Sequence, residues 1–329
     1  MLVLSAEDQQ HLLTMSEAID SVGVALGEFS AHRAITPIRT SIPVAKGNGT
    51  SLFMPSIVEA TNSLGVKFVS VFPDNKLQGK KTIYGVMMLA DVMTGEPLAL
   101  LEASYLTVLR TGAVAGLATR YLAQQKAKVL SMIGTGAQAR GLLGAIRAVR
   151  PIERIHLYNR NEGKAHAFAR EIAEHSAAAG VEVRVFHTAD QALAGADIVV
   201  TATNASTPVF SAESVGTGVH LNAIGSFRPT MQELPTGIMT KASKIVVEAR
   251  EAALEETGDL IIPIEQGAIT SDSLYAELGE IVNGDKMGRE SDAEITVFKS
   301  VGLAAMDVVI AKALYDRALQ LGVGQRVSL

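Results

Sequence analysis

The stretch Val129-Leu130-Ser131-Met132-Ile133-Gly134-Thr135-Gly136-Ala137-Gln138-Ala139 decides the fold of this chain. It is an apolar run of strand length that leads into a G-x-G-x-x-A turn and then into an amphipathic helical pattern. Glycines let the backbone bend sharply and approach a ligand closely, and the free N–H groups of the following helix attract phosphate. Strand, turn and helix stand in the order that a dinucleotide-binding unit requires, so we expect a pyrophosphate at Gly134 and Gly136.

The residues after the second predicted strand indicate which dinucleotide binds. This strand spans residues 154–158 and ends at Asn159 and Arg160, where an NAD-specific site usually carries an acidic residue for the ribose hydroxyls. The planar guanidinium of Arg160 can pair with a 2′-phosphate, with Asn159 as a neutral hydrogen-bond partner. We therefore expect NADPH as the cofactor, with NADH as the alternative. A lone arginine in a turn can also be no more than a solvated surface residue.

Strands and helices alternate from about Ala127 to Val247, which predicts an α/β fold with a doubly wound parallel sheet. The predicted strands are 129–133, 154–158, 181–186, 197–202, 219–224 and 244–248, and the predicted helices are 137–149, 162–178 and 189–194. Thr201 and Thr203 stand at the carboxyl end of the fourth strand, and this edge is where open sheets of this kind bind ligands. They are expected to flank the cofactor, or else to form only a strand-ending turn.

The two ends of the chain show a different pattern. A helical opening at 14–31 is followed by short apolar runs at 51–54, 65–72, 83–91 and 97–102, which indicates a separate α+β unit. The apolar periodicity from Ile295 to Leu321 predicts one long helix, and Asp292 and Glu294 at its start are expected to cap it or favour its dipole.

The composition excludes several classes of function. A hydrophobic fraction of 48% over 329 residues supplies enough core for two domains, and a net charge of −5 argues against nucleic-acid or membrane-surface binding. The absence of cysteine excludes disulfides, thiolate metal sites and cysteine nucleophiles, and the seven histidines show no metal-ligand spacing. No targeting or membrane-spanning stretch is apparent, so we expect a cytoplasmic protein whose partners are small molecules or a second copy.

Three basic residues of the N-terminal part stand among apolar neighbours: Arg39, Lys67 and Arg110. A buried cation is costly unless it is paired, and three of them with no obvious neighbouring acid would form a receptor for a small carboxylate. Their spacing alone leaves a second interpretation open, in which each residue has its own salt bridge or extends to the surface.

Further motifs occur along almost the whole chain. They include Lys81-Thr82, Arg110-Thr111-Gly112, the R-P-x-x-x-E-L segment at 228–234 and the V-F-x-S-V-G segment at 297–302. With Arg39, Lys67 and the glycine turn, and in this order, they resemble the ornithine cyclodeaminase and mu-crystallin family. The resemblance implies a homodimer in which a Rossmann-type NAD(P)-binding domain, 121–303, is inserted in a substrate-binding and dimerisation domain, 1–120 plus 304–329.

The resemblance also implies roles for individual residues. Arg39, Lys67 and Arg110 would hold the carboxylate of a substrate. The cofactor residues expected from the patterns above and from the resemblance are Thr82, Arg110, Thr111, Gly134, Gly136, Ala137, Gln138, Asn159, Arg160, Thr201, Thr203, Gly225, Ser226 and Ser300.

The chain departs from the cyclodeaminases of that family at two acidic positions. Phe227 stands where those enzymes carry a catalytic aspartate, and Leu52 replaces a second acidic residue. A substrate whose side chain carries a free ammonium group would find neither of these acidic partners here. An uncharged ring suits a pocket formed by Leu52, Phe227 and Val301. The segment 225–234 resembles the cyclic-imine reductases of the family, which implies NAD(P)H-dependent reduction of Δ1-pyrroline-2-carboxylate, and of Δ1-piperideine-2-carboxylate, to L-proline and L-pipecolate.

In such a reductase we expect Lys67 to be catalytic. The nicotinamide carries the hydride, and Lys67, or a water that it holds, is the best available donor of a proton to the imine nitrogen. Two alternatives stay open. One is an alanine-type amino-acid dehydrogenase or ornithine cyclodeaminase in which a displaced acid such as Glu59 substitutes, and the other is a non-enzymatic NADP-binding protein of the crystallin type.

Overall fold

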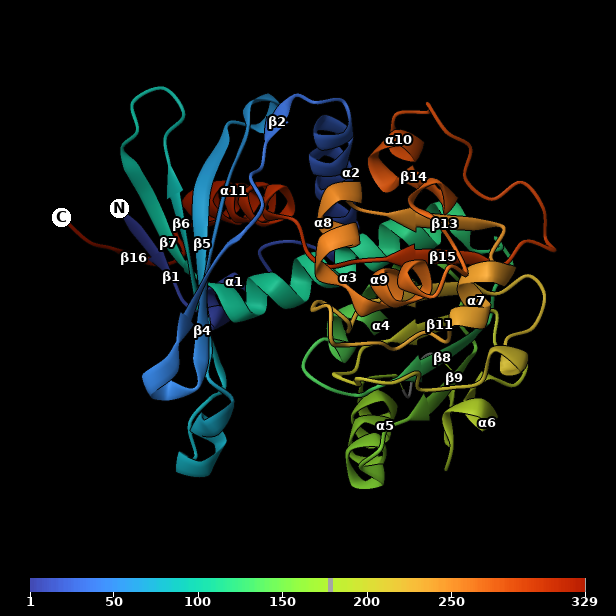
Figure 1. Cartoon of the computed structure of the whole chain (residues 1–329). Helices are drawn as coiled ribbons and strands as arrows, with labels where there is room; N and C mark the ends of the chain where they lie inside the picture. Colours follow the sequence, from blue (N-terminus) through green and yellow to red (C-terminus); the bar gives the residue numbers. More distant parts are fainter. Residues whose placement is uncertain (177–179, 329) are drawn as a thin grey trace. The chain divides into compact units, whose positions relative to one another are not determined.

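The computed structural model describes residues 1–176 and 180–328. The chain divides into two compact units, Met1–Arg110 with Leu303–Leu329, and Thr111–Gly302. We call them the first and the second unit (Figure 1). The first boundary between the units falls after Arg110, inside the helix α3 (Ala103–Leu122), whereas the sequence places it after residue 120.

The first unit is built on an eight-stranded sheet in the order β16-β1-β7-β6-β5-β4-β2, with β3 paired to β4. Neighbouring strands are antiparallel except β1 and β7, which run parallel. The strands are β1 (Leu2–Leu4), β2 (Ala34–Ile35), β3 (Thr40–Val44), β4 (Gly49–Val58), β5 (Ser63–Val71), β6 (Ile83–Ala90), β7 (Pro97–Glu102) and β16 (Gln325–Arg326). The four apolar runs predicted between residues 51 and 102 correspond to β4 through β7.

Besides the first part of α3, the described residues of this unit form the helices α1 (Ala6–Gln9), α2 (Met15–Ser30) and α11 (Ala304–Leu321). Thr14 caps α2 through a reciprocal capping box with Glu17, and the apolar side of α2 is buried. The helix α11 packs against β4, β5 and β6, on the face of the sheet that carries Lys67. Successive side chains of a strand point to opposite faces, so Phe68 lies on the other face.

The second unit contains a parallel eight-stranded sheet in the order β10-β9-β8-β11-β12-β15-β13-β14. The strands are β8 (Val129–Ile133), β9 (Arg154–Tyr158), β10 (Glu182–Val185), β11 (Ile198–Thr201), β12 (His220–Ala223), β13 (Lys244–Val247), β14 (Leu274–Glu277) and β15 (Thr296–Lys299). The chain runs outward in one direction through β9 and β10 and in the other through β11 and β12. The strand order therefore reverses between β8 and β11, which is where sheets of this type bind ligands.

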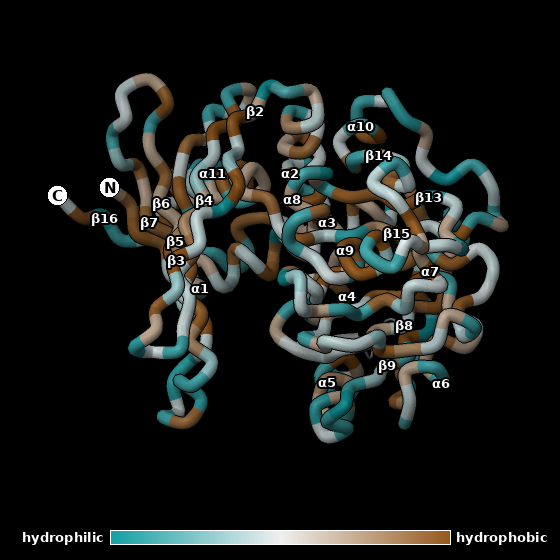
Figure 2. The backbone as a smooth tube through the Cα atoms, viewed as in Figure 1, coloured by the Kyte–Doolittle hydropathy of each residue, from teal (hydrophilic) through white to brown (hydrophobic). Residues whose placement is uncertain are grey.

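The helices of the second unit are α4 (Ala139–Val149), α5 (Glu162–Ser176), α6 (Ala189–Leu193), α7 (Thr236–Lys241), α8 (Arg250–Glu256), α9 (Gly258–Glu265) and α10 (Leu278–Val282). Strands β8, β11, β12, β13 and β15 are buried along their whole length. Figure 2 shows much hydrophilic colour on α5, which carries charged residues on its exposed side. The predicted α/β class with a doubly wound parallel sheet is confirmed. The end of the predicted helix 162–178 lies outside the described residues.

The predicted helix from Ile295 to Leu321 is wrong in its first part. Residues Thr296–Lys299 form β15 in the interior of the second sheet, and α11 begins only at Ala304. Gly302 between them has φ +92°, a conformation that ends any continuous helix. A four-residue strand with apolar residues at its centre, four residues before an apolar helix, cannot be separated from that helix by periodicity.

This correction also removes the predicted capping role of two acidic residues. Asp292 pairs with Lys126 at 2.9 Å, and Glu294 lies 3.5 Å from the ammonium of Lys244. Both acids precede a strand rather than a helix, so they have no helix start to cap.

Candidate functional site

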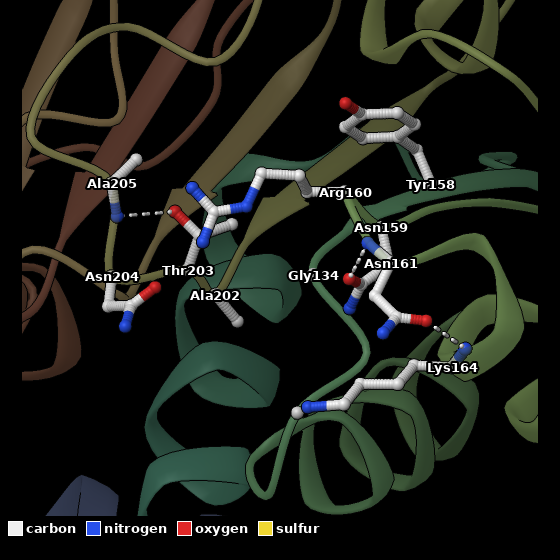
Figure 3. Close-up of a pocket in the computed structure, with 11 residues that line it drawn as sticks. Gly134, Tyr158, Asn159, Arg160, Asn161, Lys164, Ala202, Thr203, Asn204 and Ala205 are labelled. Atoms are coloured by element: carbon white, nitrogen blue, oxygen red, sulfur yellow. Dashed lines mark hydrogen bonds between the residues drawn. The ribbon is translucent and has the colours of Figure 1, made fainter.

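A pocket of about 650 Å³ lies at the reversal point of the second sheet. Its walls come from the glycine turn after β8, the end of β9 and the end of β11 (Figure 3). The lining residues are Gly134, Gly136, Tyr158, Asn159, Arg160, Asn161, Lys164, Ala202, Thr203, Asn204 and Ala205. This volume falls in the range of small-molecule sites, and the position is the one predicted for a dinucleotide.

The two glycines of the turn serve different purposes. Gly134 has φ +103°, and a Cβ atom there would lie 2.5 Å from the carbonyl oxygen of Ala202, so only glycine fits. At Gly136 a Cβ atom would meet nothing within 4 Å, which leaves this backbone open to a ligand. Gln138 follows in the turn, and its buried Oε1 has no hydrogen-bond partner among the described residues. An open backbone and an unpartnered polar atom fit a turn that receives a phosphate-bearing ligand.

The end of β9 supplies the cationic side of the pocket. Asn159 donates to the hydroxyl of Thr135 at 2.9 Å and accepts from the backbone N–H of Asn161 at 2.9 Å, which fixes this turn. Arg160 is exposed, and its side chain extends toward Thr203 in Figure 3. None of the described residues that line the pocket is acidic. The pocket therefore suits an anionic group beside Arg160.

The other predicted cofactor residues of the second unit do not line this pocket. Thr111 is buried in α3, and Ala137 and Gln138 lie in the turn after its two glycines. Thr201, Gly225 and Ser226 surround the buried carboxylate of Glu233. Ser300 is buried, and its hydroxyl donates to Glu248 at 2.9 Å. Thr82 lies in the first unit, in the turn before β6.

A second charged centre lies in the first unit, between β5, α3 and α11. The ammonium of Lys67 donates to Asp307 Oδ2 at 2.6 Å, and Arg110 Nε lies 3.1 Å from Asp307 Oδ1. The side chains of Lys67 and Asp307 are 2% and 0% exposed. One buried carboxylate is thus shared by two buried cations, which leaves the group with one positive charge in excess.

The environment of Lys67 changes how readily it holds its proton. Burial lowers the pKa of Lys67 to about 8, the attraction of Asp307 opposes this shift, and the positive charges of Arg110 and Arg39 add to it. Arg39, in the segment before β3, is therefore close enough to act on Lys67 electrostatically. A lysine whose pKa is lowered to about 8 releases its proton more readily than an ordinary lysine does at physiological pH.

Asp307 corrects one sequence-based expectation. The sequence predicts no neighbouring acid for Arg39, Lys67 and Arg110, but Asp307 pairs with both Lys67 and Arg110. In the sequence it interrupts an apolar helix, which gives no sign of a partner 240 residues away. The cluster therefore contains its own carboxylate and still retains a net positive charge.

The three predicted apolar residues lie in different surroundings. Leu52 is half-buried on β4, two residues before Met54, which pairs with Lys67, so Leu52 shares the face of Lys67. Phe227 is 36% exposed in the second unit, where the guanidinium of Arg228 lies 5.4 Å from its ring centre. Val301 is buried, and its backbone N–H donates to Glu248 at 2.9 Å.

The arrangement of acidic side chains and of apolar helices also bears on the class of protein. Among residues 1–176 and 180–328, no group of three or more histidine, cysteine or acidic side chains is placed to hold a metal ion. Within the same residues, no helix is both long and apolar enough to span a membrane.

Known proteins resemble this chain over its full length. The family model of the ornithine cyclodeaminase/mu-crystallin family matches residues 1–322. The chain is 56% identical over 327 residues to a Δ1-pyrroline-2-carboxylate reductase of Bacillus cereus, covering 99% of both chains. The structure of Thermococcus litoralis Δ1-pyrroline-2-carboxylate reductase in complex with NADH and L-proline superimposes with a TM-score of 0.95 at 42% identity, over 99% of this chain and 100% of the other.

A second solved structure is an archaeal alanine dehydrogenase dimer with bound NAD. It superimposes with a TM-score of 0.92 at 35% identity, over 100% of this chain and 99% of the other. The motifs quoted from the sequence, the two-unit architecture and these matches over the full length agree. This chain belongs to the ornithine cyclodeaminase/mu-crystallin family.

Proposed function

We propose that this protein is an NAD(P)H-dependent reductase that converts Δ1-pyrroline-2-carboxylate to L-proline. The observation that carries the proposal is the buried group of Lys67, Arg110 and Asp307, which has an excess positive charge and a lysine whose pKa is lowered to about 8. The 56% identity to a reductase of this substrate supports it. We extend the proposal to Δ1-piperideine-2-carboxylate, because one added methylene changes binding by only about 1–3 kcal/mol.

The substrate carboxylate is expected to neutralise the excess charge of the buried group. Arg110 has a planar guanidinium that can bind a carboxylate through two hydrogen bonds, and Arg39 adds a further positive charge near Lys67. Leu52, on the same face as Lys67, offers an apolar neighbour for a ring without charge. With Phe227 and Val301, it completes the set of substrate residues that we propose.

Lys67 is the proposed proton donor. A protonated imine accepts hydride far more readily than a neutral one, and an ammonium with a pKa of about 8 is largely charged at neutral pH yet releases its proton easily. When bound, the reduced nicotinamide supplies the hydride that the C=N carbon receives. Asp307 lies between Lys67 and Arg110 and holds both in place.

The pocket of the second unit is the proposed cofactor site. Gly134 and Gly136 would receive the pyrophosphate, and Arg160 would pair with the 2′-phosphate of NADPH. The asparagine at position 159 carries no charge that would repel this phosphate. NADH lacks that phosphate and would use the same pocket with lower affinity.

We also propose that the protein is a homodimer. Phe53, Phe68 and Val86 form one cross-strand row on the sheet face opposite α11, and they are 38%, 37% and 44% exposed. The two phenylalanine rings lie 5.1 Å apart. An exposed apolar sheet face of this kind fits a second copy of the chain, and a relative of known structure is a dimer. The cytoplasmic location stays a prediction.

The reaction can be tested by following nicotinamide absorbance with purified protein. NADPH is supplied with Δ1-pyrroline-2-carboxylate, with pyruvate plus ammonia, or with no acceptor, and ornithine plus NAD⁺ is assayed for ammonia release. We expect NADPH consumption with the cyclic imine and formation of L-proline. Consumption only with pyruvate plus ammonia, or ammonia release from ornithine, would replace the proposal by a dehydrogenase or a cyclodeaminase. Binding without turnover would indicate a non-enzymatic NADP-binding protein.

A further inference from the structure

We propose that Glu233 is a positioning residue for the dinucleotide pocket, because its buried carboxylate ties together the ends of two neighbouring strands, β11 and β12. This inference rests on the proposed function only in that the pocket takes a dinucleotide. It does not depend on which substrate is reduced.

The Glu233 carboxylate accepts four hydrogen bonds. The hydroxyl of Thr201 and the backbone N–H of Thr203 donate from the end of β11, at 3.0 and 2.6 Å. The backbone N–H groups of Gly225 and Ser226 donate from beyond the end of β12, at 2.6 and 3.1 Å. Because two loops that follow different strands share one acceptor, the position of each loop depends on this carboxylate.

Other buried charges hold Glu233 in turn. Asp259 accepts the backbone N–H groups of Glu233 and Leu234 at 2.7 and 2.9 Å. The ammonium of Lys299 lies 3.1 Å from Asp259 and donates to the carbonyl of Ala223, the last residue of β12, at 3.1 Å. Glu233, Asp259 and Lys299 are all fully buried. The carboxylate therefore sits in a rigid frame rather than on a mobile side chain.

The frame reaches the pocket through close backbone contacts. Thr203 lines the pocket, and its Cγ2 would lie 3.0 Å from a Cβ atom at Gly134. A Cβ atom at Gly225 would collide with the carbonyl oxygen of Thr203 and with Glu233 Oε1. The glycine turn, the end of β11 and the loop after β12 are thus packed without spare volume. A shift of Thr203 must move the wall that faces Gly134.

The chemistry of the four partners explains why a carboxylate is required. Every partner is a hydrogen-bond donor, and an ionised carboxylate has only hydrogen-bond acceptors. A glutamine of the same size would turn an NH₂ group toward at least one of these donors. One or both loops would then have to move away from residue 233, and this would displace the wall of the pocket.

The test is the equilibrium dissociation constant of NADPH, measured through its own fluorescence without any imine, in the wild type and in Glu233→Gln. We expect the dissociation constant to rise about tenfold. Hydrogen exchange of the peptides containing Thr203 and Gly225 should accelerate in the same variant. Because no imine is present, failure of the reductase assay would leave this result untouched.

A matched control separates positioning from general stability. Asp197 accepts the backbone N–H groups of Lys128 and Val129 at 2.7 and 2.9 Å, at the opposite, amino-terminal edge of the same sheet. We expect Asp197→Asn and Glu233→Gln both to lower the melting temperature, but Asp197→Asn should leave the dissociation constant of NADPH unchanged. Equal effects of both variants on NADPH binding, or no effect of Glu233→Gln, would overturn the proposal.

A second variant keeps the proposal testable if Glu233→Gln does not fold. Thr201→Val removes one of the four donors and preserves the shape of the side chain. We expect a rise in the dissociation constant of NADPH of about threefold, roughly the contribution of one hydrogen bond. An unchanged constant in a folded Thr201→Val protein would count against the positioning role.

Discussion

The two units each contain a buried group of charges, and the two groups have opposite balances. In the first unit, Lys67 and Arg110 share the single carboxylate of Asp307. In the second unit, the single ammonium of Lys299 faces two carboxylates, Asp259 and Glu233. One group therefore has an excess of positive charge and the other an excess of negative charge.

The two buried groups also differ in what balances their excess charge. The protein itself supplies the donors for the carboxylates of the second unit, since Glu233 accepts four hydrogen bonds and Asp259 accepts two backbone N–H groups. In the first unit, the ion pairs of Lys67 and Arg110 both end on the same acid, Asp307. Burial raises the pKa of Glu233 and lowers that of Lys67. A buried charge balanced by backbone is structural, whereas an unbalanced one calls for a ligand of opposite sign.

Removing the carboxylate of Asp307, which pairs with Lys67 and Arg110, should have the largest effect on stability. Asp307→Asn leaves two buried cations without a charged partner, so we expect the free energy of unfolding to fall by about 3–5 kcal/mol in urea denaturation. Replacing Lys67 and Asp307 together in Lys67→Met/Asp307→Leu should restore part of the stability, because only Arg110 then lacks its charged partner, and none of the activity. The control is Asp316→Asn, which loses a partly exposed pair with Lys312 on the same helix and should change stability by less than about 1 kcal/mol. A loss below about 1 kcal/mol in Asp307→Asn would contradict the account.

Replacing Lys67 alone should show whether it acts in the reaction or only in the stability of the protein. Lys67→Met is expected to lower kcat about 100-fold at saturating imine, because the proton donor is lost. Lys244→Met is the matched control: Lys244 is also buried, but it lies in the second unit and pairs with Glu290 and Glu294. It should lose stability and keep its kcat. A fall in affinity for the imine with unchanged kcat in Lys67→Met would rule out the donor role.

The pH dependence of the reaction should reflect the titration of Lys67. Lys67 donates only while it is protonated, and its pKa is lowered to about 8. The rate of imine reduction should therefore fall above about pH 8, by about tenfold per pH unit, and the fall should be absent in Lys67→Met. A wild-type rate that stays constant up to about pH 10 would be incompatible with this assignment.

Replacing Arg160, an exposed cation of the second unit, should give the smallest effect. Arg160→Ala should weaken NADPH binding about tenfold and leave NADH binding unchanged, because only NADPH carries the 2′-phosphate. Stability should not change, since Arg160 is exposed. Arg154, exposed at the other end of the same strand, provides the control, and Arg154→Ala should bind both nucleotides normally. Equal loss of NADH affinity in Arg160→Ala would show that Arg160 does not distinguish the two nucleotides.

Much of the fold is predictable because its signals are local. The strand, glycine turn and helix from 129 to 149 are adjacent in sequence, and the alternation that follows specifies a parallel sheet. The strand β15 escapes prediction because its four buried residues merge with the apolar pattern of α11. Its place between β12 and β13 depends on contacts between segments far apart in the chain.

The candidate site is predictable only in part for the same reason. Lys67 and Arg110 stand out as cations among apolar residues, but Asp307 becomes their partner only through the packing of α11 on the sheet. Glu233 stands within a quoted motif, yet its partners are mostly backbone N–H groups, which no sequence pattern displays.

The central claim is that the charge excess of the first unit binds the carboxylate of a cyclic substrate. It is tested most directly by calorimetric titration of the wild type and Arg110→Met with pyrrole-2-carboxylate and its uncharged carboxamide, in the presence of NADP⁺. We predict that the wild type binds the carboxylate at least about 100-fold more tightly than the amide, and that this preference disappears in Arg110→Met. Equal binding of the two ligands by the wild type, or a preference that survives in Arg110→Met, would contradict the account.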